Sequence, residues 1–214
     1  MSNIVIFASG NGSNAEVIIK HFENNPKGKV KLVVTNNPNA KVIEKSQKLS
    51  VPVLVLNNKD FSDSSKLIEI LKNNETDLIV LAGFLRKIDE KLLSAFEDKV
   101  INIHPSLLPK YGGKGFYGTK VHEAVLKAKE KVTGITIHYV NENYDEGDIK
   151  FQIDCEVDES DDVVSLSKKV SQLEHKFYPI IIEKTIENIK KGISLTRSAT
   201  APETIVAQVA ANIP

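Results

Sequence analysis

Short apolar runs alternate with helix-like stretches through the first half of the chain. Ile4–Ala8, Val30–Thr35 and Asp77–Leu81 are almost wholly apolar, which is typical of strands that are covered on both faces. Each run is followed by a segment in which apolar residues recur at helical spacing. This alternation predicts an α/β fold, with a three-layer, doubly wound and mostly parallel sheet.

The second half changes this pattern. Gly134–Val140 and Ile149–Val157 read as two strands joined by an acidic loop, and we expect them to form an antiparallel pair appended to the sheet. A long amphipathic helix then runs to about Lys190. We expect one domain over residues 1–196, and residues 197–214 form a tail to which the sequence assigns no role.

The composition limits the kinds of ligand and partner that we expect this chain to bind. Lys and Arg number 28, as do Asp and Glu, so the net charge of zero favours small-molecule substrates over nucleic acid or an anionic membrane. Cys155 is the single cysteine, which excludes an internal disulfide and suits a cytoplasmic protein. The five histidines are dispersed without metal-ligand spacing, so we expect no metal.

A glycine-rich turn follows the first strand, at Ser9–Asn14, and precedes a helix. Such a turn lets the backbone approach an anion, and the helix N-terminus presents free N–H groups. Ser13 and Asn14 add side-chain donors and can cap the helix. The turn also fits the dinucleotide pattern, but the second strand ends in Asn36-Asn37-Pro38 without the required acid. We therefore favour a single phosphate over NAD, with a tight turn that binds nothing as the alternative.

The stretch Val100–Pro109 joins an apolar strand to a loop that prolines bracket. Asn102 and His104 share one face of this strand because side chains alternate. An amide and an imidazole at a strand's carboxyl edge suit acyl transfer, where one donor stabilises an oxyanion and one group moves a proton. A buried polar pair with satisfied hydrogen bonds fits the spacing equally well. A serine hydrolase is disfavoured because the G-x-S-x-G turn is absent.

Several motifs resemble those of the 10-formyltetrahydrofolate-dependent formyltransferase family. The core motif is Asn102 to Pro109, and further similar segments are Ser9–Asn14, Leu81–Arg86 and Asp145-Glu146-Gly147. The resemblance spans nearly the whole chain. It implies the formyltransferase fold, with 10-formyltetrahydrofolate as cosubstrate. The turn at Ser13-Asn14 resembles the branch of the family that formylates 5-phosphoribosylglycinamide in purine synthesis.

The resemblance also assigns roles to residues. It implies that Asn102 and His104 stabilise the oxyanion and move the proton, with Asp145 supporting the histidine and raising its pKa. A second set would bind the substrate phosphate and its glycinamide part, and consists of Gly12, Ser13, Asn14 and Glu174. A third set would line the folate pocket together with Asn102, and consists of Leu85, Arg86, Lys87 and Ile88.

Two alternatives stay open: a formyltetrahydrofolate hydrolase, and a non-catalytic domain that binds a phosphorylated metabolite. The family relatives that hydrolyse the cofactor or act on tRNA resemble longer chains, so length and the phosphate turn favour the purine enzyme. The glycine-rich segment Gly112–Gly118 is longer than in some relatives, so its contacts do not transfer. We expect a monomer or a homodimer.

Overall fold

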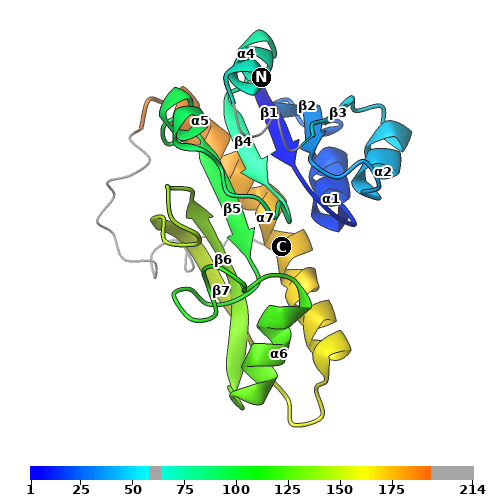
Figure 1. Cartoon of the computed structure of the whole chain (residues 1–214), viewed down its shortest axis with the longest axis vertical. Helices are drawn as coiled ribbons and strands as arrows, with labels where there is room; N and C mark the ends of the chain where they lie inside the picture. Colours follow the sequence, from blue (N-terminus) through cyan, green and yellow to red (C-terminus); the bar gives the residue numbers. More distant parts are fainter. Residues whose placement is uncertain (58–63, 194–214) are drawn as a thin grey trace.

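The computed structural model describes residues 1–57 and 64–193, and it is built around one seven-stranded sheet (Figure 1). The expected boundary at residue 196 and the tail lie outside the described residues. The strands run in the order β3-β2-β1-β4-β5-β6-β7. Their bounds are β1 (Ser2–Phe7), β2 (Gly28–Thr35), β3 (Val53–Val55), β4 (Leu78–Leu81), β5 (Val100–His104), β6 (Val132–Tyr139) and β7 (Ile149–Glu156).

The sheet is parallel through its first five strands. β1 pairs in parallel with both β2 and β4, while β5 to β6 and β6 to β7 are antiparallel. The predicted mostly parallel sheet with an appended antiparallel pair is therefore confirmed. The chain first builds outward from β1 to β3 and then returns to the other side of β1. This reversal between β1 and β4 opens a crevice at the carboxyl ends of the strands, where sheets of this kind bind ligands.

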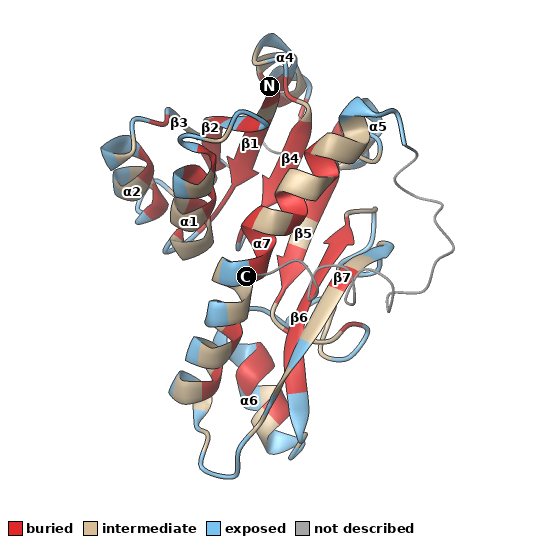
Figure 2. Ribbon diagram, turned by 180° about the vertical axis from the view of Figure 1, so that it is seen from behind, coloured by how far each residue is buried: buried red, intermediate tan, exposed pale blue. Residues whose placement is uncertain are grey.

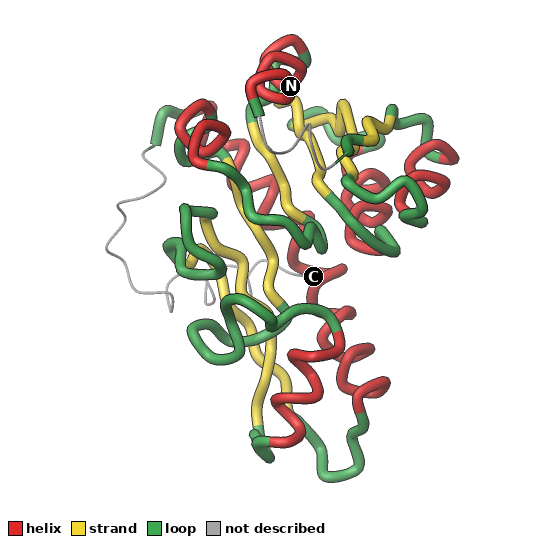
Figure 3. The backbone as a smooth tube through the Cα atoms, in the orientation of Figure 1, coloured by secondary structure: helices red, strands yellow, loops and turns green. Residues whose placement is uncertain are grey.

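Helices cover both faces of the sheet (Figure 3). They are α1 (Ser13–Phe22), α2 (Val42–Lys48), α4 (Ser65–Asn73), α5 (Glu90–Ala95), α6 (Thr119–Lys127) and α7 (Val163–Lys190). Ile4 and Ile6 of β1 belong to a core shared with α1 and α7, whereas Val5 and Phe7 pack with α4 and α5 on the other face. Figure 2 shows that the central strands, such as β1, β4 and β5, are buried, whereas the edge strand β7 is largely intermediate in burial. No helix among the described residues is long and apolar enough to cross a membrane.

The start of α1 differs from the prediction. Gly12 is the N-cap residue, with a left-handed backbone (φ 72°), and no side chain caps the helix. Ser13 is already the first helical residue, so Ser13 and Asn14 lie within the first turn and cannot act as caps. The expectation that they cap α1 is wrong, because the left-handed backbone of Gly12 lets the helix begin directly after it, at Ser13.

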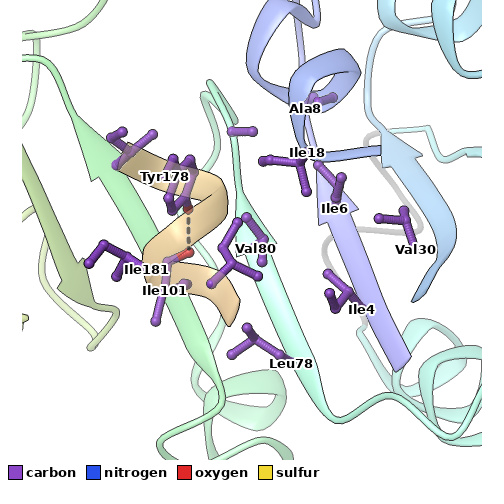
Figure 4. Close-up of a cluster of buried hydrophobic side chains, with 14 of the residues drawn as sticks. Ile4, Ile6, Ala8, Ile18, Val30, Leu78, Val80, Ile101, Tyr178 and Ile181 are labelled. Carbon is purple, nitrogen blue, oxygen red and sulfur yellow. Dashed lines mark hydrogen bonds between the residues drawn. The ribbon is translucent and has the colours of Figure 1, made fainter. Parts of the chain in front are cut away.

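Tyr178 fixes α7 against the sheet. Its side chain is fully buried, and its hydroxyl donates to the carbonyl oxygen of Leu81 at 2.9 Å and lies 3.4 Å from that of Ile101 (Figure 4). A buried phenol needs such partners, so these contacts set the position of α7 over β4 and β5. Glu174, one turn earlier in α7, is thereby placed at the carboxyl edge of the sheet.

Candidate active site

A pocket of about 340 Å³ lies at the carboxyl edge of the sheet. Its walls come from the N-terminus of α1, the loops after β4 and β5, the loop between β6 and β7, and α7. These segments are far apart in the sequence and meet where the strand order reverses, which agrees with the general rule for such sheets. The predicted site residues that line the pocket are Asn14, Leu85, Asn102, His104, Asp145 and Glu174.

Asn102, His104 and Asp145 form a cluster in the wall of the pocket. Asn102 and His104 come from the end of β5, and Asp145 comes from the loop between β6 and β7. The Nδ1 atom of His104 lies 3.4 Å from Oδ2 of Asp145, and the Nδ2 atom of Asn102 lies 3.4 Å from Oδ1 of the same carboxylate. Asp145 is therefore the residue that links the amide and the imidazole.

The surroundings of His104 fix where its proton sits. Its Nε2 lies 2.7 Å from the backbone carbonyl oxygen of Tyr111, so this nitrogen carries the hydrogen. Nδ1, beside Asp145, is then the atom that gains or loses a proton. Burial lowers the pKa of His104 below its usual value, although Asp145 and the Tyr111 carbonyl act to raise it. The expected effect of the carboxylate is present, but the desolvation of a side chain that is only 4% exposed outweighs it.

Asp145 remains a carboxylate at neutral pH. Burial acts to raise its pKa, but the contact with His138, the charge of His104 and the Gly113 N–H together hold the pKa below its usual value. The Gly113 N–H donates to Oδ2 at 2.9 Å. The Asp145 backbone is left-handed (φ 58°), so the loop turns sharply at this residue and directs the side chain inward.

His138 orients the amide of Asn102. The two residues are directly opposite each other in the β5–β6 ladder, and Nδ2 of Asn102 lies 3.2 Å from Nε2 of His138. Nδ1 of His138 lies 2.8 Å from the carbonyl oxygen of Tyr139, so it carries a hydrogen, and Nε2 faces the Asn102 amide. The sequence alone does not predict this contact, because neither strand's sequence fixes the register that pairs His138 with Asn102.

The glycine-rich turn packs against the start of α2. A Cβ atom on Gly12 would lie 2.6 Å from Cβ of Val42, so this position needs glycine for its packing as well as for its left-handed backbone. Ser9 ties the turn to neighbouring loops. Its hydroxyl donates to Oδ1 of Asn36 at 2.6 Å and accepts from the N–H of Leu85 at 3.1 Å. The turn is therefore rigid, with the first turn of α1 facing the crevice.

Glu174 and Asn14 meet between the turn and the pocket. Nδ2 of Asn14 donates to Oε2 of Glu174 at 2.9 Å. Burial raises the pKa of Glu174, and the hydrogen bond from Asn14 opposes this rise. A carboxylate held in this way can accept a hydrogen bond from an ammonium or amide group of a bound molecule.

The remaining predicted site residues lie outside the pocket wall. Gly12 and Ser13 stand beside Asn14 at the N-terminus of α1. Arg86, Lys87 and Ile88 continue from Leu85 without lining the pocket, and Ile88 is buried in the core against α5.

Three exposed aromatic side chains at the pocket were not predicted, namely Phe116, Tyr117 and Tyr144, in addition to the less exposed Phe84. Each of the first three is more than a third exposed. Phe116 and Tyr117 belong to the glycine-rich segment, whose glycines were the available signal that a ligand contacts it. Among the described residues, no group of three or more His, Cys, Asp or Glu side chains is arranged to hold a metal ion.

Comparisons with known proteins agree with this geometry. The profile of the family described as Formyl transferase matches residues 2–182. The phosphoribosylglycinamide formyltransferase of Bacillus subtilis is 39% identical over 197 residues, which cover 90% of this chain and 98% of that protein. The chloroplastic phosphoribosylglycinamide formyltransferase of Arabidopsis thaliana is 36% identical over 210 residues, or 94% of this chain and 72% of that protein.

Solved structures of proteins with the same name have this fold. The enzyme from Anaplasma phagocytophilum superposes with a TM-score of 0.81 at 31% identity, covering 87% of each chain. The enzyme from Bacillus halodurans superposes with a TM-score of 0.77 at 37% identity, covering 86% of this chain and 94% of its own.

Proposed function

This chain belongs to the formyl transferase family, and we propose that it transfers the formyl group of 10-formyltetrahydrofolate to the amine of 5-phosphoribosylglycinamide in purine synthesis. The single observation that carries the proposal is the cluster of Asn102, His104 and Asp145 in one pocket wall. The same pocket continues to Asn14, in the first turn of α1, where a phosphate would bind. Relatives that match over nearly the whole chain carry this enzyme's name.

The amine attacks the formyl carbon directly. A C–N bond forms to the substrate amine and the bond to N10 of the folate breaks, through a tetrahedral intermediate that carries an oxyanion. The Nδ2 group of Asn102 is the donor for this oxyanion. Its nitrogen lies 3.2 Å from Nε2 of His138 and 3.4 Å from Oδ1 of Asp145. We propose that the formyl oxygen replaces the longer contact, while His138 keeps the amide in orientation.

His104 moves the proton. Its lowered pKa leaves it neutral at pH 7, with Nδ1 free to accept the proton of the attacking amine. Asp145, at 3.4 Å from Nδ1, then stabilises the imidazolium. The proton finally passes to N10 of the departing tetrahydrofolate, so no charge accumulates on the enzyme.

The two substrates approach from opposite ends of the pocket. Gly12, Ser13 and Asn14 would hold the phosphate through the N–H groups of the first turn of α1, and Glu174 would accept from the glycinamide part. The folate ring would lie along Leu85 and the adjoining loop through Arg86 and Lys87, and Ile88, which is buried in the core, would support this loop without touching the ring. Leu85 is 56% exposed, which leaves an apolar surface beside the pocket for a flat ring.

The proposal also covers the location, oligomeric state and partners of the enzyme. We propose a cytoplasmic monomer or homodimer that acts on small molecules without a nucleic-acid partner. The support is the balanced charge and the single cysteine, Cys155. We also propose that residues 1–196 form one formyltransferase domain, since the family match extends over residues 2–182.

One experiment separates this proposal from its alternatives. The enzyme is incubated with 10-formyltetrahydrofolate that is radiolabelled in the formyl group, with and without 5-phosphoribosylglycinamide. Transfer predicts that the label appears in the ribonucleotide and that little is released when the amine is omitted. Label released as formate at the same rate in both reactions would instead identify a hydrolase. Tight binding of the ribonucleotide with all label left on the folate would identify a binding domain.

A further inference from the structure

We propose that the segment Tyr111–Gly113 is a positioning element for His104 and Asp145, and that a hydrogen bond from the Tyr111 side chain to Glu130, outside the pocket, holds this segment in place. The catalytic part of this inference rests on the proposed function. The geometric part concerns only contacts within the chain, so a measurement without substrates tests it.

The segment Tyr111–Gly113 contacts both His104 and Asp145 through its backbone. The carbonyl oxygen of Tyr111 accepts from Nε2 of His104 at 2.7 Å, and the N–H of Gly113 donates to Oδ2 of Asp145 at 2.9 Å. His104 ends β5 and Asp145 lies in the loop after β6, so the two come from different parts of the sheet. Two peptide groups of one short segment therefore set the distance between them.

The backbone of this segment adopts an unusual conformation. Tyr111 is left-handed (φ 56°), which a residue with a large side chain rarely adopts. At Gly112 a Cβ atom would lie 2.5 Å from Cδ2 of Leu108 and 3.3 Å from Cβ of Asp145. Such a backbone persists only when its surroundings determine it, and residues of this kind gather at functional sites.

The Tyr111 side chain helps to hold the backbone in this conformation. Its hydroxyl donates to Oε1 of Glu130 at 2.9 Å, and its ring meets Phe116 edge-on with centroids 6.1 Å apart. Burial, followed by the hydrogen bond to Glu130, raises the pKa of the Tyr111 hydroxyl, so the donor stays protonated. Glu130 also accepts from Nζ of Lys110 at 2.9 Å, but that lysine is 65% exposed on the outside of the contact.

The chain just before the segment is fixed independently. Oγ of Ser106 donates to the carbonyl oxygen of Lys110 at 2.6 Å, and Oγ1 of Thr136 donates to the carbonyl oxygen of Ser106 at 2.7 Å. Gln152 donates to the carbonyl oxygen of Leu108 at 2.9 Å. Strands β6 and β7 thus hold the chain up to Lys110, and the Tyr111–Glu130 contact continues this support into the positioning segment.

The ionisation of His104 reports on the segment. The titratable groups that act on this imidazole are Asp145 from the β6–β7 loop and His138 from β6, and His104 in turn acts on His122 of α6. The Tyr111 carbonyl raises the pKa of His104, against the larger effect of burial. Displacing that carbonyl should therefore lower the pKa of His104 further, even if every other group stays in place.

The test compares Tyr111→Phe, which removes only the hydroxyl, with Lys110→Met, which removes the exposed ion pair and keeps the Tyr111–Glu130 bond. We expect Tyr111→Phe to lower kcat by about fivefold to tenfold, the range for loss of one hydrogen bond, and to change KM for either substrate by less than about twofold. NMR titration of the His104 ring without substrates should show a lower pKa. Lys110→Met should change neither quantity.

Glu130→Ala removes the acceptor of the same hydrogen bond. It should reproduce the Tyr111→Phe effects, and the double variant should be no worse than either single variant. An unchanged His104 pKa in both Tyr111→Phe and Glu130→Ala would overturn the proposal, whatever the effect on stability. Absence of formyl transfer by the wild-type enzyme would refute the proposed function instead, because the titration needs no turnover.

Discussion

The Nδ1 atom of His104 lies 3.4 Å from Oδ2 of Asp145, and the two side chains are only 5% and 12% exposed. Burial lowers the pKa of the imidazole, while the carboxylate acts in the opposite direction. The pair therefore holds a neutral histidine whose protonated form is stabilised by a nearby negative charge. These are the properties required of a group that accepts a proton during the reaction and then releases it.

Asp145→Asn should move the acidic limb of the pH profile to lower pH. The neutral form of His104 is the active base, so kcat/KM falls as the pH drops through its pKa, which lies below the usual 6.5. Removing the negative charge of Asp145 removes an influence that raises this pKa, so the limb shifts downward. The measurement is kcat/KM from pH 5 to 8, with the exposed neighbour Glu146→Gln as the control. Superimposable profiles for Asp145→Asn and the wild type would break the link between the two residues.

Glu174→Gln should weaken binding of the ribonucleotide and leave binding of the folate unchanged. Glutamine keeps an oxygen that can accept from Asn14 but loses the charge that strengthens a hydrogen bond to the substrate. We expect KM for 5-phosphoribosylglycinamide to rise by about tenfold. The exposed Glu23→Gln serves as the control. A rise in KM for 10-formyltetrahydrofolate, with an unchanged KM for the ribonucleotide, would show that Glu174 binds the folate and would contradict the proposal.

Ser13→Ala should weaken binding only of substrates that carry a phosphate. Ser13 is the first residue of α1, where a hydroxyl and free N–H groups would meet a phosphate. KM should rise for 5-phosphoribosylglycinamide and stay constant for the analogue that lacks the phosphate. Steady-state kinetics with the two amines measure this difference. An equal change with both would indicate that the residue supports the fold and not the phosphate.

Gly12→Ala should destabilise the fold. A side chain at this position meets both a left-handed backbone and the Cβ atom of Val42 at 2.6 Å. We expect the free energy of unfolding to fall by about 2–4 kcal/mol, which combines backbone strain with overpacking. Urea unfolding measures these values, with Gly10→Ala as the control, since a Cβ atom there meets nothing within 4 Å. Equal losses for Gly10→Ala and Gly12→Ala would contradict this explanation.

The sequence predicted the sheet because its signals are local and repeated. Continuous apolar runs marked the buried strands β1, β2, β4 and β5, and the change of pattern after Gly134 marked the antiparallel pair. The carboxyl-edge rule then indicated that Asn102 lies near the turn after β1. The structure brings Asn14, Asn102 and Glu174 to one pocket from positions up to 160 residues apart.

Features that depend on three-dimensional contact were not predictable. The support of His104 by the Tyr111 carbonyl is a backbone contact, and every residue type has such a carbonyl. The direction of the His104 pKa shift depends on the balance between burial and Asp145, and sequence reasoning considered only the charge. The prediction that Ser13 and Asn14 cap α1 was wrong because the helix begins at Ser13, directly after the left-handed Gly12.

The formyl-transfer rate of Asn102→Ala tests the central claim most directly, because this amide is the proposed donor to the oxyanion. We predict that kcat falls by about a hundredfold or more, as for removal of one oxyanion donor, while circular dichroism shows an intact fold. Asn24→Ala, which changes an exposed amide outside the pocket, should leave kcat unchanged. A kcat equal to that of the wild type in Asn102→Ala would remove this residue from the mechanism and contradict the account.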